Sequence, residues 1–400
     1  MPPLSEPTAP DAPARARELA ARFAALAAHH DETGEPPAAQ VQALFEAGLL
    51  RLTVARRDGG EGAGLGLARQ VVQAVAEGDP SVALILSMHY AQHAAIAHAR
   101  RRADDGVAPS PWPRALADRV VADTLRGPAL INALQVEPEL GSPSHGGLPA
   151  ATARRDPAEG GWRLSGRKIY STGSHLLAWY SVLAVTDEPE PRVGHFLVPR
   201  GSPGVRIEPT WDPLGMRATA SHDVVFEDTP VAAGQAANLY PAADGVRRDE
   251  HGFGWYLNLV GSVYIATAIA ARDWLLRFLN ERRPTALGGA ALASLPTVQD
   301  AVGRIELLIH AATGLLDAHA RAFDAGEPSQ PLGLAARQTA VEHAARATAL
   351  ALELAGNHGI SRRNALERHY RNAQCAQIHA PASALVRANL GRAALQRLAA

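Results

Sequence analysis

Two histidines four residues apart are the first candidates for chemistry in this sequence. The stretch SMHYAQHAAI (87–96) would place His89 and His93 on one face of a helix. An imidazole can exchange a proton near neutral pH, and two on one face can bind a metal ion. No third His or acidic ligand follows in a recognisable spacing, so we predict no metal site. The surrounding residues are mostly apolar, which favours a packed imidazole with one satisfied nitrogen for His93.

Composition excludes several classes of protein. The 400 residues carry a formal net charge of −1, which argues against a broad nucleic-acid surface and favours a small-molecule substrate. Cys375 is the single cysteine, so no internal disulfide framework is possible, and we interpret it as inert packing. The first residues lack a charged and then apolar leader, and no run of eighteen apolar residues occurs. We therefore expect a cytoplasmic protein with no membrane span.

The elements that must position these side chains follow from hydrophobic periodicity. Residues 1–14 are rich in Pro and Ala and predict a disordered tail. Apolar residues three and four apart predict a helical domain over 15–126. The period shifts towards two over 127–235, which predicts a central antiparallel β domain. Long Ala-rich helical patterns then fill 236–400, the last of them over 376–399, and predict a four-helix bundle. The fold class is α+β.

Four motifs, in this order along the chain, give a resemblance to the acyl-CoA dehydrogenase superfamily of flavoproteins. They are RRDGGEGAGLGL (56–67), ALQVEPELGS (133–142), GWRLSGRKIYSTGS (161–174) and LGMRATASHDVVFED (214–228), of which the last is the closest match. The resemblance covers nearly the whole chain. It implies the same order of domains and a flavin cofactor, FAD or FMN.

The resemblance also implies which residues contact the flavin. A flavin needs backbone and hydroxyl groups near its pyrimidine edge and N5, and small residues near its phosphates. Thr172 matches the hydroxyl near N5, and Tyr170 matches a residue beside the ring. The motifs 133–142 and 161–174 contain the cofactor-binding residues that the resemblance implies in this part of the chain: Leu134, Val136, Gly141, Ser142, Tyr170 and Thr172.

A second set of matching residues lies in the predicted bundle. Arg282 in NERRP and the residues Gly356, Asn357 and Gly359 in LAGNHGIS match groups that complete the flavin site of a neighbouring subunit in this family. The resemblance therefore implies a homo-oligomer, usually a dimer of dimers. Thr285 stands where the family often has an aromatic residue near the adenine, which leaves FAD and FMN both open.

The carboxylate that serves the family as a base is missing from both of its usual positions. A dehydrogenase removes the α-proton of an acyl thioester with a glutamate just before the last helix. Here AQIHAPAS (376–383) places Ala380 at that position, and His379 precedes it. A second branch of the family carries its glutamate on the first helix of the bundle, near Tyr256 in this chain. A displaced base from the acids in VRRDEHG (246–252) remains an alternative.

Another branch of the family lacks the glutamate and resembles this chain more closely. In dibenzothiophene monooxygenase and related enzymes, reduced flavin reacts with O₂, and histidines with a hydroxyl hold the flavin peroxide. The matching residues are His89, His379 and Thr172 or Ser171. The resemblance thus implies a flavin-dependent oxidoreductase that favours monooxygenase chemistry, supplied by a flavin reductase or another electron-transfer partner. Two alternatives stay open: a dehydrogenase with a displaced base, and a catalytically silent flavin-binding assembly partner.

Overall fold

The computed structural model describes residues 11–139, 147–158 and 160–396, which form three regions in chain order. The first region is helical, as predicted. Its helices are α1 (Ala12–Thr33), α2 (Ala38–Glu46), α3 (Leu65–Gly78), α4 (Pro80–Asp104) and α5 (Arg114–Arg126). Helix α1 begins three residues inside the segment predicted as tail. Asp11 causes this early start, because its side chain accepts a hydrogen bond from the Ala14 N–H at 2.8 Å and caps the helix.

The central region is an eight-stranded sheet. Its strands are β1 (Leu130–Leu134), β2 (Thr152–Arg155), β3 (Trp162–Lys168), β4 (Leu177–Asp187), β5 (Arg192–Pro199), β6 (Val205–Glu208), β7 (Asp223–Val231) and β8 (Ala236–Pro241). They run in the order β6-β7-β3-β2-β4-β5-β8, with β1 also beside β4.

Two details of the sheet correct the predictions. The sheet is mainly antiparallel, as predicted, but strands β1 and β2 pair with β4 in parallel. Strand β8 pairs with β5, so the sheet continues to Pro241, beyond the predicted boundary at 235. Short segments of period two show that a strand exists, but not which partner it pairs with.

Helices of the first region cover one face of the sheet. Ile96 of α4 and Leu116 and Val120 of α5 pack in one apolar cluster with Trp179 of β4 and Leu197 of β5. This packing places the middle of α4, which carries His89, next to the start of β1, where the Ile131 N–H lies 3.3 Å from His89 Nδ1.

The third region contains the helices α6 (Glu250–Glu281), α7 (Pro296–Asp324), α8 (Gln330–Ala355), α9 (Ala365–Gln374) and α10 (Ser383–Gln396). Helix α6 lies at the centre and packs against α3, α4, α7, α8 and α9. It is also long and apolar enough to cross a membrane by length and composition, but 78% of its most apolar stretch is buried inside the protein.

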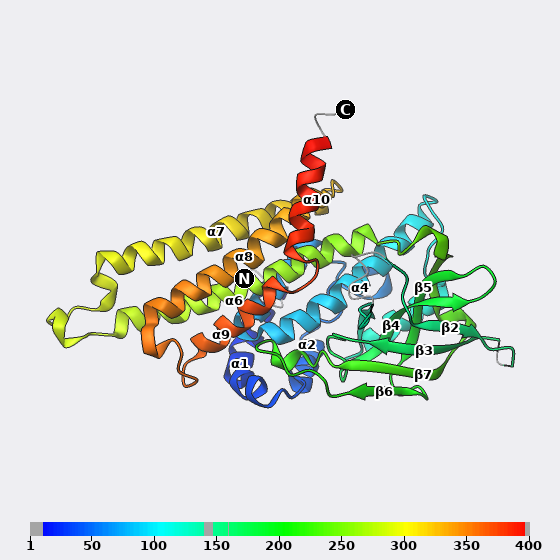
Figure 1. The fold of residues 1–400 in the computed structure, drawn as a ribbon, viewed down its shortest axis with the longest axis horizontal. Helices are drawn as coiled ribbons and strands as arrows, with labels where there is room; N and C mark the ends of the chain where they lie inside the picture. The colour runs from blue at the N-terminus through cyan, green and yellow to red at the C-terminus, as the bar shows by residue number, and fades with distance from the viewer. Residues whose placement is uncertain (1–10, 140–146, 159, 397–400) are drawn as a thin grey trace, which may run out of the picture.

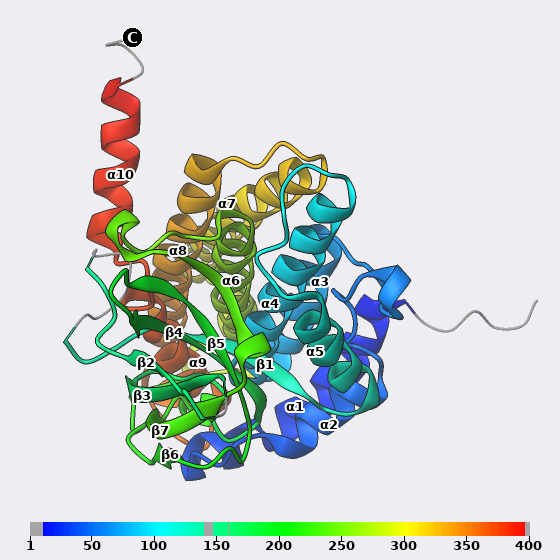
Figure 2. The ribbon, with the colours of Figure 1, turned by 90° about the vertical axis from the view of Figure 1, so that its right-hand side faces the viewer.

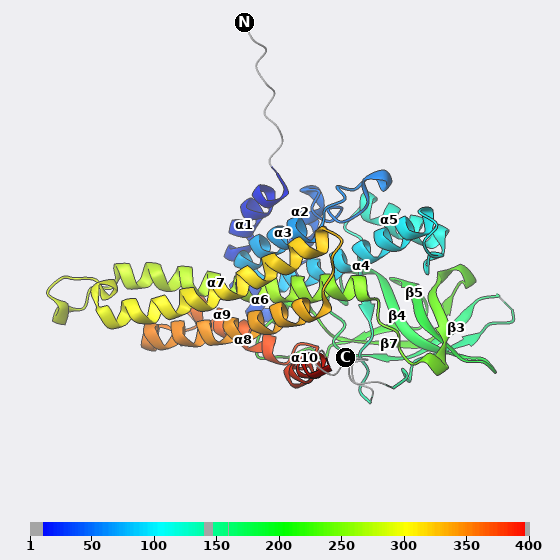
Figure 3. The ribbon, with the colours of Figure 1, turned by 90° about the horizontal axis from the view of Figure 1, so that it is seen from above.

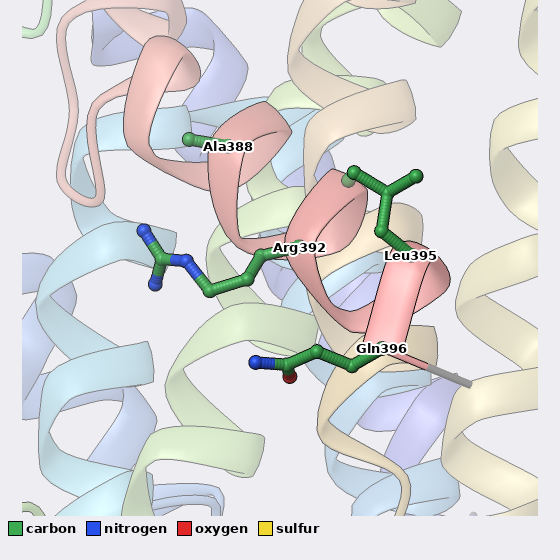
Figure 4. Close-up of a pocket in the computed structure, with 5 residues that line it drawn as sticks. Ala388, Arg392, Leu395 and Gln396 are labelled. Atoms are coloured by element: carbon green, nitrogen blue, oxygen red, sulfur yellow. The ribbon is translucent and has the colours of Figure 1, made fainter. Parts of the chain in front are cut away.

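The fourth helix of the bundle was predicted in the wrong place. The short helix α9 packs on α6 and α8, whereas α10, from the predicted segment 376–399, projects from the body (Figures 1 and 2). Val386 is the buried anchor of α10, and the outer part of the helix carries Ala388, Arg392, Leu395 and Gln396 around a shallow surface hollow (Figure 4).

The molecule is elongated, with the sheet at one end and the free end of the bundle at the other (Figures 1 and 3). Helices α6 and α8 both end at the tip that is remote from the sheet. The ring of Phe278, near the end of α6, lies 5.1 Å from that of His358, just after α8.

Candidate active site

Two loops meet beside the end of β3, and their backbones are strained. One loop joins β3 to β4, and the other joins β6 to β7. Tyr170, Met216 and Ala220 lie in the left-handed region with φ of 54°, 55° and 45°, which non-glycine residues rarely adopt and which often marks functional sites. Backbone hydrogen bonds join the loops: the N–H groups of Ser171 and Gly173 donate to the carbonyls of His222 and Thr219 at 3.2 and 2.8 Å.

Three hydroxyl groups form a chain across these loops. Thr172 Oγ1 lies 3.0 Å from Ser221 Oγ, and Ser221 Oγ lies 2.8 Å from Thr219 Oγ1. Thr219 Oγ1 then donates to the carbonyl of Met216 at 2.9 Å. Thr219 and Ser221 are buried, whereas Thr172 is half-buried. Sequence reasoning missed Thr219 and Ser221, although both belong to the motif 214–228 that carried the strongest resemblance.

The residues that precede Thr172 present a flat aromatic surface beside it. The Tyr170 side chain is 62% exposed, and its ring lies edge-on to Trp211 with centroids 6.2 Å apart. Ser171 is buried, and its Oγ has no hydrogen-bond partner among the residues that the structure describes. Of the two predicted hydroxyls, Thr172 is therefore the one on the accessible side of the loop.

A buried ion pair joins the loop after β1 to the end of β3, where the loop that carries Thr172 begins. The Ile169 N–H donates to the Val136 carbonyl at 2.9 Å, and the ammonium of Lys168 contacts the carboxylate of Glu137. Burial lowers the pKa of Lys168 to about 8, and the charge of Glu137 opposes this shift. Lys168 is the only lysine of the chain, yet its role was not predicted.

The remaining flavin residues predicted near this loop are only partly covered by the structure. Leu134 is buried at the end of β1, and Val136 is half-buried. Gly141 and Ser142 lie outside the described residues.

The loop between β6 and β7 is held from two other parts of the chain. The Met216 N–H donates to the side-chain carbonyl of Asn372 in α9 at 2.7 Å. A guanidinium nitrogen of Arg217 donates to the backbone carbonyl of Asp31 in α1 at 2.7 Å. The Asp31 carboxylate accepts from Arg371 at 2.6 Å, which closes the connection between α1 and α9.

The geometry of His89 argues against its predicted place at a cofactor face. The side chain is completely buried, and Nε2 lies 2.9 Å from the Leu50 carbonyl, to which it donates. Nδ1 accepts from the Ile131 N–H at 3.3 Å. Burial lowers the pKa of His89 to about 4, so the ring is neutral at pH 7. Both nitrogens serve the backbone, and His93, 4.5 Å away between ring centroids, contacts Thr124.

His379 lies in a different environment, at the turn between α9 and α10. Its Nδ1 is 2.9 Å from the Tyr264 hydroxyl, and the Tyr256 hydroxyl donates to the Ala380 carbonyl at 2.7 Å. Arg337, fully buried in α8, donates to the carbonyls of His379, Ala380 and Pro381. The hydrogen-bond partners of His379 and His89 differ, and no contact between the two imidazoles joins them among the described residues.

Burial and charge set the protonation of this turn. Burial, with the nearby charge of Arg337, lowers the pKa of His379 to about 3. Burial raises the pKa of Tyr256 to about 12 and that of Tyr264 well above its ordinary value. At neutral pH the turn therefore presents two phenols, a neutral imidazole and a guanidinium.

The acids proposed as displaced bases are engaged elsewhere. Asp249 caps α6 by accepting from the His251 N–H at 3.1 Å, and Glu250 accepts from Gln330 at 2.8 Å. Both side chains are exposed at the start of the helix, one turn or more before Tyr256.

The residues predicted to serve a neighbouring subunit cluster at the remote tip of the bundle. Arg282 ends α6 and is exposed, and Gly356 and Asn357 are exposed at the end of α8. Gly359 is buried. This tip lies far from the sheet of its own chain (Figure 1).

Three family descriptions match successive parts of the chain. The acyl-CoA dehydrogenase N-terminal domain matches residues 12–100, the middle domain matches 136–229, and the C-terminal domain matches 245–395. Among curated relatives, "Putative acyl-CoA dehydrogenase YdbM" of Bacillus subtilis is 30% identical over 368 residues, which cover 91% of each chain. An amino sugar nitrososynthase, RubN8 of Streptomyces rubradiris, is 30% identical over 273 residues, 66% of this chain and 60% of that protein.

Solved structures show the same fold. KijD3 in complex with FMN and a dTDP-linked amino-keto sugar superposes with a TM-score of 0.83 at 25% identity, over 98% of this chain and 95% of that one. Dibenzothiophene monooxygenase TdsC from Paenibacillus sp. A11-2 gives a TM-score of 0.80 at 19% identity, over 96% and 97% of the two chains.

The residues around Thr172 fit a flavin. The exposed ring of Tyr170, the accessible Thr172 hydroxyl and a strained backbone suit a flat cofactor with a polar edge. With the three matched domains and these relatives, the chain belongs to the acyl-CoA dehydrogenase family and is a flavin-dependent oxidoreductase of the kind that uses FAD or FMN.

Proposed function

We propose that this protein uses reduced flavin and O₂ to transfer oxygen to a small substrate. The observation that carries the proposal is the turn at 379–381, where Tyr256, Arg337 and His379 surround the position of the family's base and no carboxylate contacts it among the described residues. A bound reduced flavin would supply the electrons that activate O₂. The protein's own groups would then orient the reacting oxygen and the substrate.

The contact between Tyr256 and Ala380 supports this interpretation. The family places its glutamate at one or the other of these two positions, and here the two residues lie within a hydrogen bond of 2.7 Å. Both positions therefore border the same space, and neither has an acid. The half-buried Tyr256 phenol, with its pKa raised to about 12, keeps its proton at neutral pH and cannot remove an α-proton.

The groups of this turn are suited to bind a reacting oxygen and not to remove an α-proton. If Tyr264 donates to His379 Nδ1, the ring keeps its proton on Nε2 and can donate it to a ligand. Arg337 adds a positive charge without a carboxylate partner among the residues described, and its Nε is buried and unpartnered. Donors and positive charge stabilise an anionic oxygen. We propose His379 as a catalytic residue, with Thr172 at the flavin, and we assign His89 to the protein interior.

The relatives suggest what the substrate is. RubN8 is named as an amino sugar nitrososynthase, and the KijD3 structure holds an amino-keto sugar with FMN. We propose an amine or another heteroatom as the acceptor of oxygen. Acyl-CoA dehydrogenation is the second candidate, favoured by the similarity to YdbM over 91% of both chains.

The assembly belongs to the same proposal. Arg282, Gly356 and Asn357 lie at a tip far from the sheet of their own chain, so a second copy would be needed to bring them to a flavin beside that sheet. We propose a homo-oligomer in which each tip completes a neighbour's site, and a separate reductase that supplies reduced flavin. A single cysteine agrees with a location in the cytoplasm.

One experiment compares the two reactions on the same preparation. The protein receives photoreduced FMN or FAD, then ¹⁸O₂ and a panel of amines and amino sugars, and mass spectrometry follows the label in the product. In a parallel anaerobic cell, oxidised flavin-loaded protein receives acyl-CoA thioesters of different chain length. Labelled product supports the proposal, whereas bleaching of the flavin by a thioester without labelled product would overturn it.

A further inference from the structure

The direction of the hydrogen bonds in the hydroxyl chain can be deduced from its buried end. Thr219 Oγ1 lies 2.9 Å from the carbonyl oxygen of Met216. Two oxygens approach this closely only with a hydrogen between them, and a carbonyl has none to give. The single hydroxyl hydrogen of Thr219 therefore points at Met216.

The hydrogens of Ser221 and Thr172 are fixed in the same way. Because Thr219 has used its hydrogen, the 2.8 Å contact with Ser221 needs the hydrogen of Ser221. Ser221 is then left with lone pairs, so the 3.0 Å contact with Thr172 needs the hydrogen of Thr172. Thr219 and Ser221 are 0% and 3% exposed, so solvent has little access with which to change this direction.

We propose that this hydroxyl relay, Thr172 to Ser221 to Thr219, leaves Thr172 as a hydrogen-bond acceptor only, so that the site binds reduced flavin more tightly than oxidised flavin. The inference rests on the proposed flavin position at Thr172. Reduced flavin carries a hydrogen on N5, which can donate to Thr172. Oxidised flavin presents a lone pair at N5, which faces another lone pair.

The loop geometry keeps Thr172 in place for this contact. The Thr172 N–H donates to the Tyr170 carbonyl at 2.9 Å, and the Thr172 carbonyl accepts from the Asn132 amide at 3.1 Å. A variant that frees the Thr172 hydrogen can therefore turn Thr172 from an acceptor into a donor without moving the backbone. Ser221 and Thr219 act as positioning residues, because both are buried and they act through the orientation of the Thr172 hydrogen.

The test measures flavin binding in two redox states. Dissociation constants of oxidised and of anaerobically reduced FMN or FAD, whichever the wild type binds, are determined by titration. In Ser221→Ala, Thr172 is free to donate to oxidised N5, so the ratio of the oxidised to the reduced constant should fall by about three- to tenfold, the range of one hydrogen bond. A tenfold fall corresponds to a drop of about 30 mV in the two-electron midpoint potential.

A second variant and a control make the test specific. In Thr219→Val, Ser221 loses its acceptor and can turn its hydrogen towards Thr172, so the ratio should fall in the same direction. The control is Ser174→Ala. Ser174 is also buried and donates to the Ala220 carbonyl at 2.7 Å, between the same two loops, but it lies outside the hydroxyl relay. This variant should keep the wild-type ratio.

The outcomes separate the relay from the proposed function. Folded variants that bind flavin with the wild-type ratio in both Ser221→Ala and Thr219→Val would overturn the relay, as would an equal change in Ser174→Ala. A wild type that binds no flavin in either redox state would refute the flavin site and the relay together. A shifted ratio in a protein that makes no oxygenated product would support the relay and refute oxygen transfer.

Discussion

The buried pair Lys168–Glu137 predicts a large and specific loss of stability. Their side chains are 0% and 2% exposed, and the Glu137 carboxylate also accepts from the N–H groups of Ala150 and Ala151 at 2.6 and 3.1 Å. In Lys168→Met, the buried carboxylate keeps, among the residues that the structure describes, only its two backbone donors. Removing one partner of a buried pair costs about 3–5 kcal/mol. In the double variant Lys168→Met/Glu137→Gln no buried charge remains, so the loss should be smaller than in Lys168→Met.

Thermal unfolding of the two variants, followed by tryptophan fluorescence, measures this difference. A loss of about 1 kcal/mol lowers Tm by about 2–4 °C in domains of 150–250 residues. The matched control is Arg154→Met, which breaks the exposed pair Arg154–Asp228 in the same sheet, where the side chains are 55% and 63% exposed. Such a pair contributes at most about 1 kcal/mol. A Tm of Lys168→Met no lower than that of Arg154→Met, or a double variant less stable than Lys168→Met, would contradict a large contribution of the buried pair.

Three further predictions test the other assignments. His89→Gln should weaken the pH dependence of the free energy of unfolding. In the native protein the pKa of His89 is lowered from 6.5 to about 4, so the unfolded chain binds the proton first as the pH falls. The native protein therefore loses stability as the pH drops from about 6.5 towards 4, and the variant should not show this loss. Thermal melts between pH 7 and 5 would show this, and an unchanged pH slope would contradict it. His379→Ala should lower the rate of oxygen transfer by about 10²- to 10⁴-fold with little change in flavin affinity, and equal losses of rate and of flavin binding would point to a structural role. Arg282→Ala should weaken flavin binding without lowering Tm of the flavin-free protein, as titration and melting would show, and normal flavin binding would exclude Arg282 from the site.

The domain order was predictable because hydrophobic periodicity is a local property. Helix α10 was misplaced in the bundle because an Ala-rich helical pattern does not show which face finds a partner. The tail and sheet boundaries were wrong by a few residues for a similar reason: the cap by Asp11 and the pairing of β8 with β5 decide them.

The site residues were predictable only where a motif marked them. Thr172 and His379 stood at matched positions, but the partners that define their chemistry come from distant residues. Thr172 meets Ser221, 49 positions later, and His379 meets Tyr264. His89 also matched a position, and contacts with Leu50 and Ile131 occupy both of its nitrogens. No local pattern indicates such long-range contacts.

The loop held by Asp31, Arg217 and Asn372 has a consequence for assembly of the chain. These contacts attach the β6–β7 loop to α1 and to α9, so we expect the loop to keep its conformation only when all three regions are docked. A ligand that binds only this docked form stabilises it by mass action. Flavin should therefore act as a folding cofactor for the whole chain. At saturating flavin, α1 and α9 should exchange their amide hydrogens more slowly than in the flavin-free protein, although neither helix supplies a residue to the hydroxyl relay.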